Sequence, residues 1–136
     1  MKITDVTVNQ LRPPEGNLQS FAGPQGRLIV QVHTDEGIVG IAEGSRGLSV
    51  FRAYVDDMIK PLIVGMSPLQ PRQIWETLAL GTGERATQFP SQIVGAIDVA
   101  CWDIMGKAAG LPIYALLGGA RRTEIPLYWS RGNGWR

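Results

Sequence analysis

The chain has 136 residues, enough for one domain with its own core but too few for an eight-stranded α/β barrel, which takes about 250 residues. Its net charge of +1 produces no field that would favour nucleic acid or an anionic membrane surface. No stretch approaches the roughly 18 apolar residues of a membrane span, and the single cysteine excludes an intramolecular disulfide. These properties predict a cytoplasmic protein that binds neither nucleic acid nor membrane.

Alternating apolar residues predict three strands near the start of the chain, over residues 2–12, 27–34 and 38–43. The tripeptide 35–37 joins the second strand to the third as a tight turn, with Gly37 where a positive φ is expected. Strands that are consecutive in the chain usually pair with one another. We therefore expect a three-stranded antiparallel meander.

Beyond position 50 the apolar spacing changes to three and four residues, which predicts helices over 50–63, 68–80 and 90–109. A proline is expected to disturb the last turn of the first helix. Ser67 is expected to cap the second helix, with Pro68 as its first residue. Strands first and helices after them are typical of the α+β class, so the prediction is a meander followed by a helical bundle.

The third helix carries an apolar face at helical spacing, formed by Ile93, Ile97, Ala100, Ile104 and Ala108. Gly110 then tolerates the left-handed geometry of a helix end, and Pro112 prevents simple continuation. Cys101 is expected to be buried, and Trp75 and Trp102 to lie in the core or at a domain interface.

Three segments, 13–26, 44–49 and 81–89, show no useful apolar periodicity and are expected to be loops. The first exceeds about 12 residues, a length that is uncommon in compact domains unless the loop is functional or disordered. It is rich in Asn, Gln, Ser and Glu, so it could contact a polar ligand.

Three segments carry a resemblance to a known family: TDEGIVGIAEG at 34–44, AIDVACWDIMGKAAGLPIYALLGG at 96–119 and IPLY at 125–128. In this order and spacing they resemble the N-terminal capping domain of the enolase superfamily, in its mandelate racemase and muconate-lactonizing branch. The resemblance implies a capping domain at 1–120. It also implies a linker and the first strand of a catalytic α/β barrel at 121–136, the rest of the barrel being absent from the sequence.

In that superfamily the barrel holds the Mg²⁺ ligands and the bases that remove a proton next to a carboxylate. None of those positions exists in this sequence, so the resemblance implies no catalytic residue and no metal ligand here, and an isolated chain without activity. Two loops of the cap close over the barrel mouth. The resemblance assigns substrate contacts to these loops and to the residue after the first barrel strand: Asn17, Gln19, Ser20, Phe21, Arg46 and Ser130.

The polar first loop favours an acid-sugar dehydratase, whose substrate is a small carboxylate bearing hydroxyls. Racemases or epimerases and cycloisomerases share the same cap and remain open, as does a stand-alone binding module that has lost its barrel. The expected partners are the substrate, the chain's own barrel and further copies in a homo-oligomer.

Other candidate side chains are expected to be structural. Asp98 and Asp103 are two carboxylates on one helix and could be read as an acid–base pair. Positions five residues apart on a helix differ in direction by about 140°, so the two side chains do not share a face. Asp103 and Lys107 are one turn apart and are expected to form a surface ion pair worth a few tenths of a kcal/mol. Asp98 could instead be a buried acceptor that anchors the helix. His33 is expected on the solvated face of the sheet.

Overall fold

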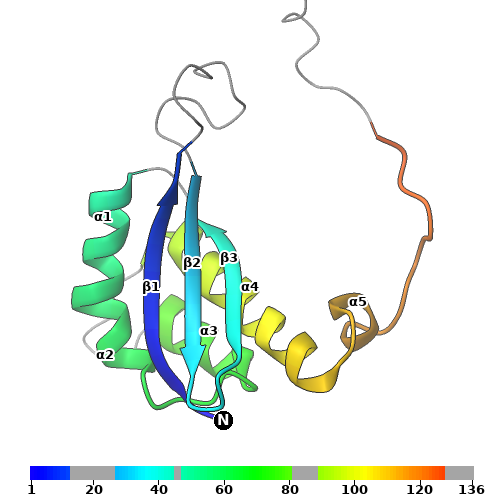
Figure 1. Ribbon diagram of the computed structural model, residues 1–136, viewed down its shortest axis with the longest axis horizontal. Helices are drawn as coiled ribbons and strands as arrows, with labels where there is room; N and C mark the ends of the chain where they lie inside the picture. Colours follow the sequence, from blue (N-terminus) through cyan, green and yellow to red (C-terminus); the bar gives the residue numbers. More distant parts are fainter. Residues whose placement is uncertain (13–26, 45–46, 81–88, 128–136) are drawn as a thin grey trace, which may run out of the picture.

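The computed structural model describes residues 1–12, 27–44, 47–80 and 89–127. Its sheet is antiparallel, in the order β1 (Ile3–Leu11), β2 (Arg27–Thr34), β3 (Val39–Gly44). The predicted meander is therefore confirmed. The turn between β2 and β3 places Gly37 at a φ of 78°, as its position predicted. Figure 1 shows the helices lying behind the sheet and beside β1.

The first predicted helix forms one continuous helical segment with a π-helical centre: α1 (Leu48–Ala53), η1 (Tyr54–Ile59) and α2 (Lys60–Ile63). It begins two residues earlier than predicted, so residues 48 and 49 are helical and not part of the predicted loop. The π turn immediately precedes Pro61, and the N–H of Lys60 donates to the carbonyl of Val55, five residues back. Proline lacks an N–H, and its ring collides with the carbonyl four residues back in a regular α-helix. A wider turn just before Pro61 relieves that collision while the helix continues.

The second helix, α3 (Pro71–Ala79), begins later than predicted. Residues 68–70 form a turn in which the N–H of Gln70 donates to the carbonyl of Ser67 at 3.1 Å. The Ser67 hydroxyl accepts from the N–H of Leu69 at 3.3 Å, so Ser67 stabilises this turn and does not cap the helix. Two prolines three residues apart both suit a helix start, and the structure uses Pro71.

The central helix α4 (Ser91–Ala109) packs across the sheet and ends at Gly110, whose φ of 64° is left-handed as predicted. A short helix, α5 (Ile113–Leu116), follows. Four of the five residues on the predicted apolar face of α4 are buried, but Ala108 is exposed. Figure 1 shows the reason: the last turns of α4 run past the edge of the sheet.

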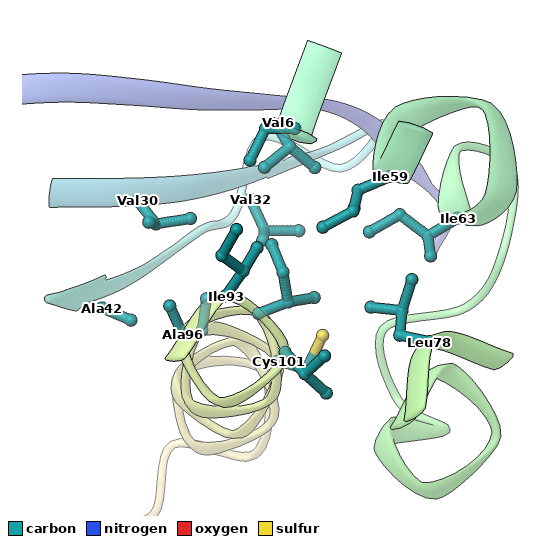
Figure 2. Close-up of a cluster of buried hydrophobic side chains, with 14 of the residues drawn as sticks. Val6, Val30, Val32, Ala42, Ile59, Ile63, Leu78, Ile93, Ala96 and Cys101 are labelled. Atoms are coloured by element: carbon teal, nitrogen blue, oxygen red, sulfur yellow. The ribbon is translucent and has the colours of Figure 1, made fainter. Parts of the chain in front are cut away.

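The core fills the space between the sheet and the helices (Figure 2). Valines of β1 and β2 meet Ile59 and Ile63 from the segment beside β1, Leu78 of α3 and the buried face of α4. Cys101 lies in this core with no exposed surface, as predicted, and burial raises the pKa of its thiol to about 12. The thiol is therefore a packing group and not a nucleophile at neutral pH.

The backbones of α4 and the sheet come close together at Gly40 of β3. A Cβ atom at this position would collide with the backbone carbonyl of Ala100 and lie 2.7 Å from Cγ1 of Ile104. Only glycine allows the two backbones to come this close.

The strand predicted from Ile125 is not formed in the described residues. Ile125 and Leu127 are 76% and 93% exposed, and 125–127 has no strand partner. A strand requires a neighbour for its backbone hydrogen bonds, and none of the described strands reaches this segment. The assignment of 121–136 to a barrel remains a prediction. Among the described helices, none is long and apolar enough to cross a membrane.

Candidate functional site

The two segments predicted to contact substrate leave the sheet at the same end. Leu11, the last residue of β1, pairs with Arg27, the first of β2, so the segment 13–26 connects two paired positions. Leu28 pairs in turn with Gly44, the last residue of β3. We call this end of the sheet, residues 10–12, 27–28, 43–44 and 47–48, the loop base.

All six predicted substrate contacts lie outside the described residues: Asn17, Gln19, Ser20, Phe21, Arg46 and Ser130. Their roles therefore stay predictions. The structure does give the fixed points from which five of these six residues extend, because the loop base flanks the segments 13–26 and 45–46 on both sides.

An ion pair joins the two halves of the loop base. Nη1 of Arg27 lies 2.8 Å from Oε1 of Glu43, across the β2–β3 pairing. Arg27 directly follows the first segment and Glu43 lies two residues before the second, so the pair links their attachment points. Both side chains are partly exposed, which limits the stabilisation to about 1 kcal/mol or less. Sequence patterns do not indicate this pair, because diagonal cross-strand neighbours are visible only once the register is known.

Two glycines shape the passage from β3 into α1. A Cβ atom on Gly44 would lie 3.2 Å from Phe51, a buried ring whose packing needs that space. Gly47 has a φ of 92°, which side-chain-bearing residues rarely adopt, and its carbonyl accepts from the N–H of Phe51 at 2.9 Å. Gly44 and Gly47 thus constrain the backbone on either side of positions 45 and 46.

A third contact holds α1 against the sheet near the same end. Nη2 of Arg52 donates to the carbonyl of Val8 in β1 at 2.8 Å. The last turn of α1 is therefore positioned relative to β1, three residues before the end of that strand. The ion pair between β2 and β3 lies within the loop base, and the Arg52 contact joins α1 to β1 beside it.

A hollow of about 510 Å³ lies beside the loop base, between the ends of β2 and β3 and the first turns of α4. Its charged lining residues are Arg27 and Glu43, which pair with each other, and its other lining includes Gly95, Ala96 and Val99. A neutralised ion pair and small apolar groups do not make an acid–base pair. The described part of the loop base can support and orient a ligand-binding loop, but it offers no proton-transfer group of its own.

The two aspartates of α4 lie apart, as the helical geometry predicted. Oδ2 of Asp103 accepts from Nζ of Lys107 at 2.6 Å, which confirms the predicted ion pair. It also accepts from the N–H of Ile41 at 2.8 Å, while Nζ of Lys107 donates to the carbonyl of Val39 at 2.7 Å. The pair is more than a helix-surface contact, because it holds the outer edge of β3 to α4. Asp98 faces a different hollow, between α3 and α4.

The lone histidine contacts a hydroxyl on the outer face of the sheet. His33 is half-buried on the sheet face opposite the core, where its Nε2 lies 3.1 Å from the hydroxyl of Thr7. Across residues 1–12, 27–44, 47–80 and 89–127, no three His, Cys, Asp or Glu side chains are grouped so as to hold a metal ion.

Residues 2–118 match the model of the mandelate racemase / muconate lactonizing enzyme N-terminal domain. The chain belongs to that family. The sheet followed by helices is accordingly the N-terminal domain fold of the enolase superfamily, as the sequence segments led us to expect.

Among curated relatives, a D-galactonate dehydratase family member of Streptomyces bingchenggensis is 37% identical over 111 residues, which cover 79% of this chain and 26% of the relative. A D-mannonate dehydratase of Novosphingobium aromaticivorans is 36% identical over 104 residues, covering 74% of this chain and 26% of that protein. The chain thus spans about a quarter of the length of these family members.

Solved structures of the family share the fold. An enolase of the mandelate racemase subgroup from Agrobacterium tumefaciens is 37% identical with a TM-score of 0.70, over 92% of this chain and 32% of that one. An N-succinyl Arg/Lys racemase from Bacillus cereus is 28% identical with a TM-score of 0.76, over 93% of this chain and 36% of that one. In each the matched region is about a third of the structure, which fits an N-terminal domain of a larger enzyme.

Proposed function

We propose that this chain is the capping part of an acid-sugar dehydratase, in which the segments 13–26 and 45–49 close over the substrate. The observation that carries the proposal is the identity of 36–37% to relatives named D-galactonate dehydratase family member and D-mannonate dehydratase. An acid sugar combines a carboxylate with several hydroxyls, so it needs a cationic contact and several hydrogen-bonding contacts.

The predicted loop residues supply both kinds of contact. The guanidinium of Arg46 suits the carboxylate, since charge-assisted pairs of this kind are strong and can be bidentate. The amides of Asn17 and Gln19 and the hydroxyl of Ser20 suit sugar hydroxyls, and Ser130 would add a contact from beyond the cap. Phe21 would cover an apolar part of the substrate and help to exclude water.

The rigid loop base supports this role. A lid acts by bringing its side chains to the same place at each closure, which requires fixed attachment points. The Arg27–Glu43 pair, the contact of Arg52 with β1 and the left-handed Gly47 provide such points. The cap would thus select the substrate, while a barrel outside this chain performs the chemistry.

The chemistry proposed for the whole enzyme is removal of the proton next to the carboxylate and loss of the neighbouring hydroxyl as water, which leaves an enol that becomes a 2-keto acid. Mg²⁺ in such an enzyme stabilises the charge that develops on the carboxylate. No three His, Cys, Asp or Glu side chains of the described residues are grouped so as to hold a metal ion, and the ligands are proposed to lie in the barrel outside this chain. The isolated chain is proposed to be inactive, to associate with further copies in the whole enzyme, and to act in the cytoplasm.

A racemase is the second candidate, because the N-succinyl Arg/Lys racemase matches the fold over 93% of this chain. The two reactions share the proton removal and differ in the next step. A dehydratase releases water and forms a keto acid, whereas a racemase returns a proton to the same carbon.

The test is an acid-sugar screen with the whole protein that contains this chain, in the presence of Mg²⁺ and in deuterated water. Formation of a 2-keto acid supports the dehydratase, and deuterium exchange at the carbon next to the carboxylate without keto acid supports the racemase. Turnover of neither kind with any acid sugar would refute the proposal. Absence of an encoded barrel after residue 136 would favour the stand-alone binding module.

The role of the second loop is tested separately in that enzyme. Arg46→Ala is expected to lower kcat/KM by about tenfold or more while leaving the melting temperature unchanged, because one lost charge-assisted contact costs about 1.5–3 kcal/mol. Lys2→Ala is the matched control, since it removes an exposed cation from the opposite end of the sheet. Equal kinetics for the two variants would show that the loop is only a connector.

A further inference from the structure

A hollow of about 830 Å³ lies between α3 and α4 and shares no lining residue with the hollow at the loop base. The turn before α3 and α3 itself contribute Leu69, Pro71 and Trp75, and α4 contributes Asp98 and Trp102. Nothing in the proposed lid function uses this place.

The two indoles of this hollow are not core residues. Trp75 is 44% exposed, Leu69 is 45% exposed, and Trp102 is only half-buried. The sequence placed the tryptophans in the core or at a domain interface, and the core is excluded. Aromatic rings left partly open to solvent on both sides of a hollow present their faces and edges to whatever enters it.

A carboxylate, that of Asp98, lines the same hollow as these rings. Asp98 and Trp102 are one helical turn apart and share a face of α4. Within the described residues no group donates a hydrogen bond to Asp98, and no cation pairs with it. The nearby guanidinium of Arg72 is held by Glu76, with Nε 2.8 Å from Oε1. Asp98 is half-buried, and this burial raises the pKa of its carboxyl.

We propose that this hollow binds the guanidinium group of a small organic cation. A guanidinium is planar, so it can lie against an indole face, and its paired N–H donors match a carboxylate. It would therefore satisfy Asp98 and use Trp75 and Trp102 at the same time. A neutral ligand leaves the carboxylate without a counter-charge, and an anion is repelled by it.

The probe is ethylguanidinium, titrated into the whole protein that contains this chain while the indole N–H signals are followed by NMR. The signals of Trp75 and Trp102, assigned through Trp75→Phe and Trp102→Phe, are expected to shift and saturate. Ethylurea has nearly the same shape without the charge and is expected to shift them far less. Equal shifts with ethylurea, or no saturable shift with ethylguanidinium, would overturn the proposal.

Variants then test whether binding needs the carboxylate of Asp98 itself or only negative charge on the chain. Asp98→Asn is expected to weaken binding by about tenfold, the loss expected when a partly buried charge partner is removed while the indoles stay in place. Asp57→Asn removes an exposed carboxylate from η1 and is the matched control, with unchanged affinity expected. Trp75→Leu changes an exposed side chain and is expected to weaken binding without unfolding the chain. Affinity that survives both Asp98→Asn and Trp75→Leu would place the cation elsewhere and refute the site.

Discussion

Replacing Gly40 with alanine is expected to destabilise the chain more than any conservative change on its surface. The added methyl group would meet the carbonyl oxygen of Ala100 and approach Cγ1 of Ile104 to 2.7 Å. The nearest obstacle is helix backbone, which cannot turn aside as a flexible side chain can. To make room, α4 must move away from β3, and its contacts with the sheet loosen along the core.

The size of the effect follows from that geometry. Overpacking a core costs about 1–3 kcal/mol where side chains can adjust, so a collision with backbone is expected at the upper end, about 3 kcal/mol. For a chain of this length that corresponds to a fall in melting temperature of about 10 °C. The change is measured by thermal and urea unfolding, followed by circular dichroism.

Gly95→Ala in α4 is the matched control. A Cβ atom at Gly95 meets nothing within 4 Å, and the residue is exposed inside a helix. Alanine is favoured over glycine there by about 1 kcal/mol, so this variant is expected to be more stable than the parent chain. Both changes restrict the unfolded chain equally, and their difference of about 4 kcal/mol therefore isolates the collision. A loss below about 0.5 kcal/mol for Gly40→Ala would refute the close approach of α4 to β3.

Four further outcomes are expected. Asp103→Ala should cost about 2 kcal/mol in urea unfolding, because it leaves the N–H of Ile41 without its acceptor and removes the ion pair with Lys107. A double-mutant cycle with Lys107→Met giving no coupling would contradict this. Cys101, with a thiol pKa of about 12, should react with iodoacetamide at pH 8 only after unfolding; rapid labelling of the folded chain would mean that the core opens. Burial raises the pKa of Asp98 above its ordinary 3.8, so ionisation of this carboxyl opposes folding once the pH passes the raised value. Asp98→Asn should therefore raise the melting temperature at pH 7 but not at pH 3. The isolated chain should self-associate through its exposed tail, and Ile125→Asp should reduce this in sedimentation runs; a parent chain that stays monomeric at tens of micromolar would refute it.

The sequence predicted the elements whose signals are local. Alternation indicated the three strands, and Gly110 marked the end of α4, because a left-handed residue at that position satisfies the last helical carbonyls whatever lies nearby. The predicted start of α3 was wrong because Pro68 and Pro71 both suit a first helical position. Only the turn at Ser67, seen in the structure, distinguishes them. Ala108 continued the apolar period of α4, yet the sheet beneath it ends first.

The candidate site was predictable only as a region. Its supporting contacts, such as Arg27 with Glu43, depend on strand register, which single-residue patterns do not reveal. The added role of Asp103 and Lys107 was missed for the same reason: helical spacing shows a neighbour on the same helix but not a strand that lies across it. The six predicted contact residues depend on the resemblance, since loop composition alone does not determine which side chains reach a ligand.

The hydrogen bonds of backbone groups along both edges of the sheet affect how copies of this chain can associate. On β1, the N–H and carbonyl of Ile3 bond to residues 65–66, and Arg52 occupies the carbonyl of Val8. On β3, the Asp103–Lys107 pair occupies the equivalent groups. A foreign strand approaching either border would have to displace these bonds before forming its own. Extension of the sheet by a strand from another copy is therefore opposed at these positions on both edges.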